Sequence, residues 1–155
     1  MNDLFKLALT FSLRWEGGEK YTNDPVDPGG ETKYGISKRA YPDIDIKSLT
    51  LAEAEQIYYN DYWLKAGCDT MDKDLAIVVF DAAVNCGVGR TKSWLAELNT
   101  KEKGNLAEGK RSARWMIQRR IQYYKDIVVK KPAFQKFLKG WLNRVNDLSK
   151  YIDIV

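Results

Sequence analysis

The residues best suited to catalysis in this sequence are carboxylic acids between positions 15 and 32. Glu16 follows Trp15 and precedes two glycines. A helix over residues 3–16 would place Glu16 in its last turn, where the negative end of the helix dipole and the apolar Trp15 ring both favour a protonated carboxyl group. A carboxyl group that keeps its proton near neutral pH can act as a general acid. Glu16 is therefore the first candidate for acid catalysis.

Further polar residues follow in the turn-rich segment 21–35. Asp24, Asp27, Glu31 and Thr32 are candidates for a second group that positions water or stabilises a developing positive charge. Two carboxyl groups that flank a sugar bond are the apparatus of a glycosidase, and their separation decides between inversion and retention. The alternative is that Glu16 is a surface residue before a glycine cap, and that Asp24 and Asp27 only shape Asp-Pro turns.

Histidine is absent from the 155 residues, and this absence narrows the possible chemistry. It excludes Ser-His-Asp and Cys-His catalysis, and the usual zinc sites built on imidazole. We therefore expect acid–base chemistry on Asp, Glu, Lys, Tyr or Cys, with no metal and no other cofactor. Cys68 and Cys86 are too few for a disulfide framework in a chain of this size, so both are expected to be free thiols that are at least half-buried.

The chain carries 25 Lys and Arg residues against 21 Asp and Glu residues, a net charge of +4. This is a mild bias towards anionic partners such as a cell envelope or nucleic acid. Residues 110–124 mix cations with aromatic rings, as nucleic-acid binders do. The cations scatter around the predicted helix, however, whereas Trp115, Ile121 and Tyr124 can pack inward. We therefore expect a solvated face with a few structural or functional arginines, and no nucleic acid as a partner.

The elements that must position Glu16 are predicted from the spacing of apolar residues. The chain is expected to form one mainly helical domain with a small β-like or turn-rich insert after the first helix. Residues 74–86 are apolar almost all round, which favours a helix in the middle of a bundle over a buried strand. The other predicted helices cover residues 3–16, 37–41, 50–67 (with a capping box at Thr50 and Glu53), 91–99 and 110–129, and one more begins at Pro132; residues 100–109 form a polar loop.

Apolar side chains at helical spacing also predict the buried face of three helices. Each helix is expected to turn this stripe towards the core. The side chains are Leu4, Leu7, Phe11 and Trp15 in the first helix; Leu51, Ile57, Tyr58 and Tyr62 in the helix at 50–67; and Phe134, Phe137, Leu138, Trp141, Val145 and Leu148 in the last helix.

The motif E-G-G at residues 16–18, followed by N-D-P-x-D-P-G-G-x-T-x-x-G-I at residues 23–36, resembles glycoside hydrolase family 108. That family comprises lysozyme-like muramidases of phages and bacteria, also called secretion activators. The similarity spans nearly the whole chain and continues through Leu49-Thr50, Ile57-Tyr58, Asp61 to Trp63, Phe80-Asp81, Val84-Asn85, Gly87, Arg120, Tyr123-Tyr124, Pro132 to Phe137, Gly140-Trp141 and Arg144.

The resemblance implies a lysozyme-like fold and a single muramidase domain over residues 1–155. It implies hydrolysis of the β-1,4 bond between N-acetylmuramic acid and N-acetylglucosamine in peptidoglycan, with Glu16 as the catalytic acid. Asp24 or Asp27, with Thr32, would then hold the attacking water or balance positive charge. The missing histidines agree with this activity, because wall-degrading amidases and peptidases rely on zinc-bound histidine or on a Cys-His pair.

Aromatic and amide side chains near these acids are candidates for contacts with sugar, because tyrosine offers an apolar face and a polar edge. Each of them could equally be a core residue. Two other activities stay open: a lytic transglycosylase acting on the same bond, and a non-catalytic module that binds peptidoglycan or an export partner. The candidate sugar contacts are Asn23, Tyr34, Tyr58, Tyr62 and Asn85.

The route to the wall is inferred from what the sequence lacks. The N-terminus begins with an acid and shows no small-residue cleavage site, which indicates a first helix and not a signal peptide. No run of about 20 apolar residues predicts membrane insertion. We expect a monomer that is made in the cytoplasm and reaches the peptidoglycan through a holin or another export route. Many members of the family carry a D-G-x-x-G-x-x-T stretch that residues 88–109 lack, so wall affinity is expected to rest on the groove and the positive surface.

Overall fold

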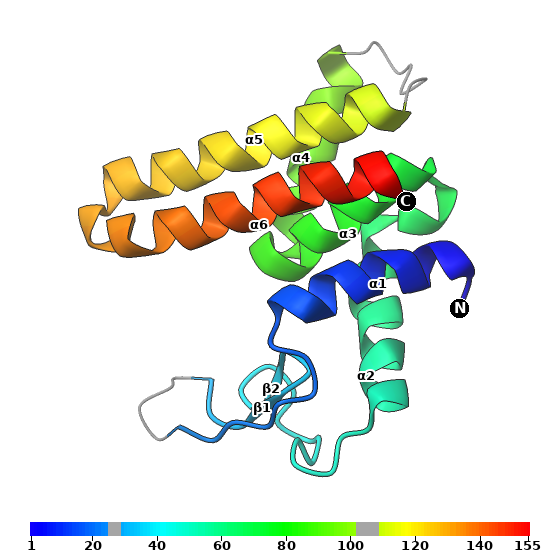
Figure 1. Ribbon diagram of the computed structural model, residues 1–155, viewed down its shortest axis with the longest axis vertical. Helices are drawn as coiled ribbons and strands as arrows, with labels where there is room; N and C mark the ends of the chain where they lie inside the picture. Colours follow the sequence, from blue (N-terminus) through cyan, green and yellow to red (C-terminus); the bar gives the residue numbers. More distant parts are fainter. Residues whose placement is uncertain (25–28, 102–108) are drawn as a thin grey trace.

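In the computed structural model, α-helices make up most of the described residues, which are 1–24, 29–101 and 109–155 (Figure 1). The expected architecture, mainly helical with a small β insert after the first helix, is confirmed. The α-helices are α1 (Asp3–Trp15), α2 (Leu51–Tyr58), α3 (Lys73–Cys86), α4 (Val88–Lys101), α5 (Gly109–Lys130) and α6 (Gln135–Ile154); the strands are β1 (Thr32–Lys33) and β2 (Ile36–Ser37); and the short turns are η1 (Tyr59–Leu64), η2 (Cys68–Thr70) and η3 (Pro132–Phe134).

Helix α3 lies at the centre and packs against α1, α4, α5 and α6. Every residue from Leu75 to Ala83 is buried, as expected for a helix that is apolar on all sides. The alternative of a buried strand in this region is therefore wrong. Cys68 and Cys86 are both buried free thiols, as predicted. None of the helices in the described residues is long and apolar enough to cross a membrane.

Helix α1 begins as predicted, and its predicted apolar face is buried at Phe11 and partly buried at Leu4 and Trp15, but not at Leu7. Asn2 caps it by accepting a hydrogen bond from the backbone N–H of Phe5 at 2.8 Å. Leu7, predicted to be buried, is 37% exposed, whereas Ala8 and Ser12 are fully buried. The buried face of α1 therefore includes these two small side chains beside Phe5, Leu9 and Phe11.

Helix α2 starts at the predicted capping box, in which Thr50 and Glu53 exchange hydrogen bonds. Its continuation, η1, is a π-helix, in which one extra residue per turn shifts the register. Trp63, five residues after Tyr58, is therefore fully buried in place of the predicted Tyr62. Leu51, also predicted to be buried, is 45% exposed.

The described residues 17–24 and 29–49 form a lobe, here called the hairpin lobe, that extends from the end of α1 (Figure 1). Strands β1 and β2 pair antiparallel, with Thr32 opposite Ser37, and Thr22 bridges to Thr32 on the other side. Residues 37–41 form turns, so the helix predicted there is wrong: Ser37 belongs to β2, and the chain turns directly after it.

Helices α5 and α6 form a long antiparallel hairpin that is closed by η3. Arg120 on α5 is buried, while Arg114 and Arg119 pair with acids on the surface. The apolar stripe predicted for α6 is buried at Val145 and Leu148 but exposed at its start, where Phe134 is 37% and Phe137 is 45% exposed. Most of the polar loop predicted at 100–109 lies outside the described residues.

Candidate active site

Glu16 lies where the helical body meets the hairpin lobe. It caps the C-terminus of α1, where its backbone N–H donates to the carbonyl groups of Ser12 and Leu13. Gly17 and Gly18 follow with φ of 90° and 59°, backbone conformations that residues with a side chain rarely adopt. At these two glycines the chain turns from α1 into the hairpin lobe. The Glu16 side chain is 23% exposed. The carboxyl group is therefore partly desolvated but still reachable from solvent.

The turn between β1 and β2 packs directly against this glutamate. A Cβ atom at Gly35 would lie 2.8 Å from Cβ of Glu16 and 2.6 Å from the Tyr58 hydroxyl oxygen. That hydroxyl group donates a 2.8 Å hydrogen bond to the carbonyl oxygen of Tyr34. Burial and the neighbouring Glu16 raise the pKa of Tyr58, which keeps it a donor. The absence of a side chain at position 35 therefore allows the hairpin lobe to pack directly against Glu16.

The charged partner of Glu16 is Arg144 of α6. Its Nη1 donates to Oε1 of Glu16 at 2.5 Å, while its Nη2 and Nε donate to the two carboxylate oxygens of Asp81 at 2.7 and 3.2 Å. A bidentate arginine–carboxylate pair fixes the plane of the guanidinium group. The protonated carboxyl group expected at Glu16 from the sequence was argued from the helix end and from Trp15, and the structure adds an ion pair with Arg144. That expectation took no account of this arginine.

Asp81 is the centre of a buried charge cluster. It also accepts hydrogen bonds from Ser12 Oγ at 2.8 Å and from Nη1 of Arg120 at 2.7 Å. Burial by itself raises the pKa of Asp81, but the guanidinium groups of Arg120 and Arg144 outweigh it and lower this pKa to about 2. With Glu16 ionised, the cluster holds two negative and two positive side chains, so its charges balance.

The network continues from Arg120 to the surface. Nε of Arg120 donates to the Tyr124 hydroxyl oxygen at 2.8 Å, and that hydroxyl group donates to Oδ1 of Asn85 at 2.5 Å. The Tyr124 ring stacks on Trp141, with centroids 5.1 Å apart. Asn85 is exposed. One chain of contacts therefore connects Glu16 with an amide and an aromatic ring on the helical side of the site.

The structure places three of the other predicted catalytic residues, Asp24, Glu31 and Thr32, on the hairpin lobe. Glu31 is half-buried and accepts a 2.6 Å hydrogen bond from the Tyr21 hydroxyl group. Thr32 lies in β1 and pairs with Thr22, and its hydroxyl group donates to the carbonyl oxygen of Gly30 at 3.4 Å. Asp24 is exposed and lies two residues after Thr22, which makes an isolated bridge to Thr32 of β1. Asp27 lies outside the described residues.

The candidate sugar contacts divide into two groups by exposure. Tyr34 and Tyr58 are 6% and 1% exposed, so they are core residues that hold the turn. Asn23 and Asn85 are exposed and Tyr62 is half-buried, so these three offer surface to a ligand. The alternative that each could be a core residue therefore applies to the first two.

Comparison with known proteins identifies the family. The sequence profile described as Glycosyl hydrolase 108 matches residues 9–87, about half of the chain, including Glu16 and Asp81. The chain belongs to glycoside hydrolase family 108. A solved structure, that of SagA from Brucella abortus, is 24% identical to it with a TM-score of 0.76, and the alignment covers 96% of this chain and 92% of that one. This likeness shows a shared fold, the expected lysozyme-like one. No curated protein matched.

The roles of Asp81, Arg120 and Arg144 in the charge cluster of this glycoside hydrolase were not predicted from the sequence. A signal for the first was present: Asp81 is the single acid in the otherwise apolar run of residues 75–84, and an acid buried in such a run needs a cation as its partner. Arg144 gave a similar signal, because it lies on the stripe of Trp141 and Leu148. The partners themselves could not be read from the sequence, because 63 residues separate Asp81 from Arg144.

A separate hollow of about 510 Å³ lies between the loop before α2 and α2 itself, and its lining includes Asp45, Glu53 and Asp61. Its carboxylates have structural tasks. Asp45 accepts from the backbone of Lys47 and Ser48, and Glu53 completes the capping box. Glu16, and not this hollow, therefore remains the candidate catalytic site of this family 108 chain.

Proposed function

We propose that the chain is a muramidase that hydrolyses the β-1,4 bond between N-acetylmuramic acid and N-acetylglucosamine in peptidoglycan, with Glu16 as the general acid. The observation that carries the proposal is the placement of Glu16. It is a partly exposed carboxyl group at the junction of two lobes, held by Arg144 and by the turn at Gly35. Membership of a glycoside hydrolase family supports the reaction type.

In the proposed reaction, Glu16 gives its proton to the glycosidic oxygen as the bond from that oxygen to the anomeric carbon breaks. Negative charge then develops on Glu16 and positive charge on the sugar ring. Arg144 stabilises the carboxylate as it forms, so its hydrogen bond is stronger in the transition state than with the neutral acid. Asp81 keeps the guanidinium group in place by accepting its two other donors.

The second half of the reaction adds water to the sugar and returns a proton to the protein. We assign this step to Asp24 or Asp27, with Thr32, which would orient the water or balance the ring charge. The turn at Gly35 brings the lobe against Glu16. That contact supports a water site on the lobe side of the scissile bond.

The test compares the wild type with Glu16→Gln on purified peptidoglycan. We expect the variant to lose about 10²–10⁴-fold in release of reducing ends, because an amide cannot donate the acid's proton. Glu55→Gln, which changes a half-buried glutamate on α2, is the matched control and should keep full activity. Circular dichroism checks that both variants fold.

The products decide between hydrolysis and transglycosylation. Mass spectrometry should find reducing ends that have gained water. Anhydro ends, which are lighter by one water, would replace the muramidase with a lytic transglycosylase. Full activity in Glu16→Gln would refute Glu16 as the acid. If the wild type released neither product, cleavage of the glycan strand itself would be refuted.

A further inference from the structure

Three aromatic side chains lie uncovered on one face at the start of α6. They are Phe134, Phe137 and Trp141, here called the aromatic ridge. Their spacing of three and four residues is that of one helix face, and neighbouring ring centroids are 5.9 Å apart. Phe134 and Phe137 are 37% and 45% exposed, and Trp141 is half-buried. A contiguous exposed aromatic patch on a soluble domain indicates a binding site.

The ridge is the outward continuation of the face that α6 buries against the rest of the helical body. From Arg144 onwards, this face is covered: Arg144 contacts Asp81, and Leu148 and Ile152 are buried. Towards its N-terminus, α6 extends past this cover, and the ridge is the part that remains exposed. The boundary between the two parts is Arg144, the partner of Glu16.

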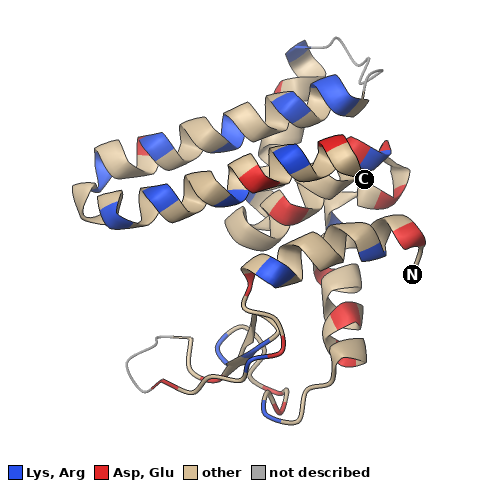
Figure 2. Ribbon diagram, viewed as in Figure 1, with Lys and Arg blue, Asp and Glu red and all other residues tan. Residues whose placement is uncertain are grey.

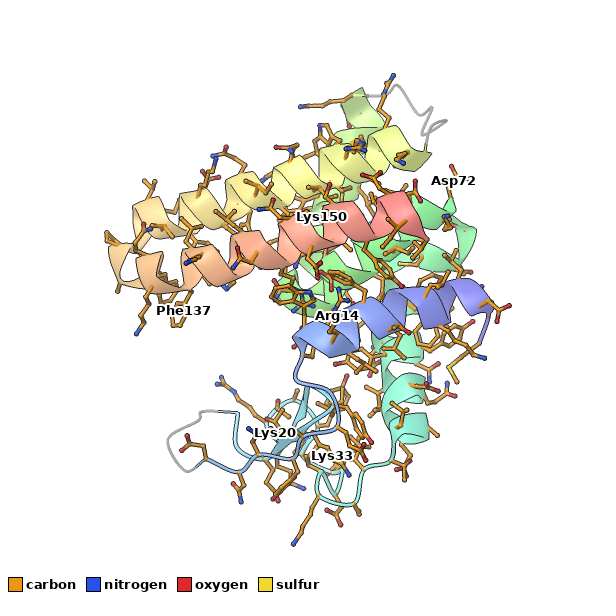
Figure 3. All side chains as sticks on the ribbon, in the orientation of Figure 1. Arg14, Lys20, Lys33, Asp72, Phe137 and Lys150 are labelled. Atoms are coloured by element: carbon orange, nitrogen blue, oxygen red, sulfur yellow. The ribbon has the colours of Figure 1, made fainter. Side chains whose placement is uncertain are left out.

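The ridge is therefore continuous with the proposed active site. Trp141 precedes Arg144 by one helical turn and stacks on Tyr124, whose hydroxyl group is hydrogen-bonded to Asn85. Figure 3 shows Phe137 projecting from α6 on the side where the hairpin lobe lies. A polymer bound at Glu16 and leaving along α6 would pass over Trp141 first, and then over Phe137 and Phe134.

The ridge is also surrounded by positive charge. Residues 125–140 include five lysines and one aspartate, so this segment alone has the net charge of the whole chain. The ammonium groups of Lys131 and Lys136 lie 5.7 and 5.0 Å from the ring centroids of Phe134 and Phe137. Figure 2 shows Lys and Arg in excess along this end of α5 and α6.

We propose that the aromatic ridge binds the peptidoglycan strand beyond the scissile bond, as an extension of the proposed active site. The proposal rests on the proposed function. A pyranose ring has an apolar C–H face that packs on aromatic rings, and the peptide stems of the strand carry carboxylates that pair with lysine. The ridge presents both features along a single line. An anionic membrane could also bind exposed aromatic rings and lysines. Membrane binding, however, would not require the aromatic ridge to begin next to Arg144, the partner of Glu16.

The binding test uses chains with Glu16→Gln, so that the polymer is not degraded. Phe134→Ala with Phe137→Ala is expected to weaken cosedimentation with insoluble peptidoglycan about tenfold. Leu64→Ala is the matched control, because Leu64 is 43% exposed on η1, away from the ridge. Oligomers of N-acetylglucosamine, which lack carboxylates, should bind more weakly and with less dependence on salt.

Kinetics of the active enzyme give the second measurement. The double variant should raise KM on long strands with little change in kcat, and should leave cleavage of short fragments unchanged. Equal peptidoglycan binding by the double variant and the Leu64 control would overturn the proposal. The proposal would also be overturned if the double variant lost binding to anionic phospholipid vesicles but not to peptidoglycan, because the ridge would then be a membrane contact.

The outcomes separate the ridge from the reaction. If the wild-type protein cleaves no peptidoglycan but its binding to peptidoglycan depends on the ridge, the muramidase proposal is overturned and the binding site is kept. Cleavage with unaltered binding in the double variant would overturn the ridge alone. A Glu16→Gln chain that fails to bind peptidoglycan at all would count against both.

Discussion

Arg144 is the residue on which the proposed catalysis most depends after Glu16. Its guanidinium group donates to two carboxylates at once, which an ammonium group on a flexible stem cannot reproduce. Arg144→Lys should therefore lower kcat about 10- to 100-fold, with KM nearly unchanged, because the acid is displaced while the substrate contacts remain. Arg114→Lys, which alters an exposed pair with Asp153, is the control and should be silent. A lysine variant with wild-type kcat would show that orientation by Arg144 is dispensable.

Asp81 makes the stability of the fold depend on acid pH. Its pKa is about 2 in the folded chain against 3.8 as the ordinary value. A depressed carboxyl pKa adds stability that is complete above about pH 4 and is lost as the pH falls through 2. Asp81→Asn leaves two buried guanidinium groups without their anion and should lower the free energy of unfolding by about 3–5 kcal/mol at pH 7.

Denaturant titrations of both chains at pH 7, 4 and 2 test this prediction. The difference in unfolding free energy between wild type and Asp81→Asn should shrink between pH 4 and pH 2. Comparing the two chains at each pH removes the contribution of other carboxylates with lowered pKa, such as Glu53 and Asp153. A difference that is the same at all three values would contradict the assigned role of Asp81.

At the scale of elements, the packing of the β1–β2 turn against the C-terminal end of α1 depends on Gly35. Gly30 and Gly35 both have positive φ, 67° and 75°, so alanine is strained at either. A Cβ atom at Gly30 would meet its nearest neighbour at 3.9 Å, but one at Gly35 would clash with Glu16 and Tyr58. Gly30→Ala should therefore cost about 1–2 kcal/mol of stability and keep activity.

Gly35→Ala should cost more stability and lower kcat about 10²-fold, because it moves Glu16 away from its position. Thermal unfolding and peptidoglycan hydrolysis measure the two effects. If Gly35→Ala behaved like Gly30→Ala in both, the turn would not position the acid.

Several elements could be predicted because their signals are local. The capping box fixed the start of α2, and the apolar run fixed α3. The π-helix after Tyr58 had no such signal, because its extra residue is set by how Trp63 packs in the core. Glu16 was found from its neighbours, but its partner was not, since Glu16 and Arg144 are 128 positions apart in the sequence.

At the scale of the whole molecule, the hairpin lobe depends on the helices. It has only two pairs of strand residues of its own. Its buried side chains, such as Ile36 and Ile46, belong to the same core cluster as Tyr58 and Phe80 of the helical body. A lobe with so small a sheet does not fold alone. We therefore expect residues 1–155 to unfold as one cooperative unit.

Hydrogen exchange under increasing denaturant tests this expectation in both lobes. The backbone N–H groups of Thr32 and Lys38 are hydrogen-bonded within the hairpin lobe, to Thr22 and Glu31. They should exchange with a free energy close to that of the amides in the middle of α3, because breaking the lobe exposes the shared core. Exchange of the lobe amides at a much lower free energy would show that the lobe opens by itself. The proposed active site at Glu16 would then lie between two units, and its geometry would depend on how they close on each other.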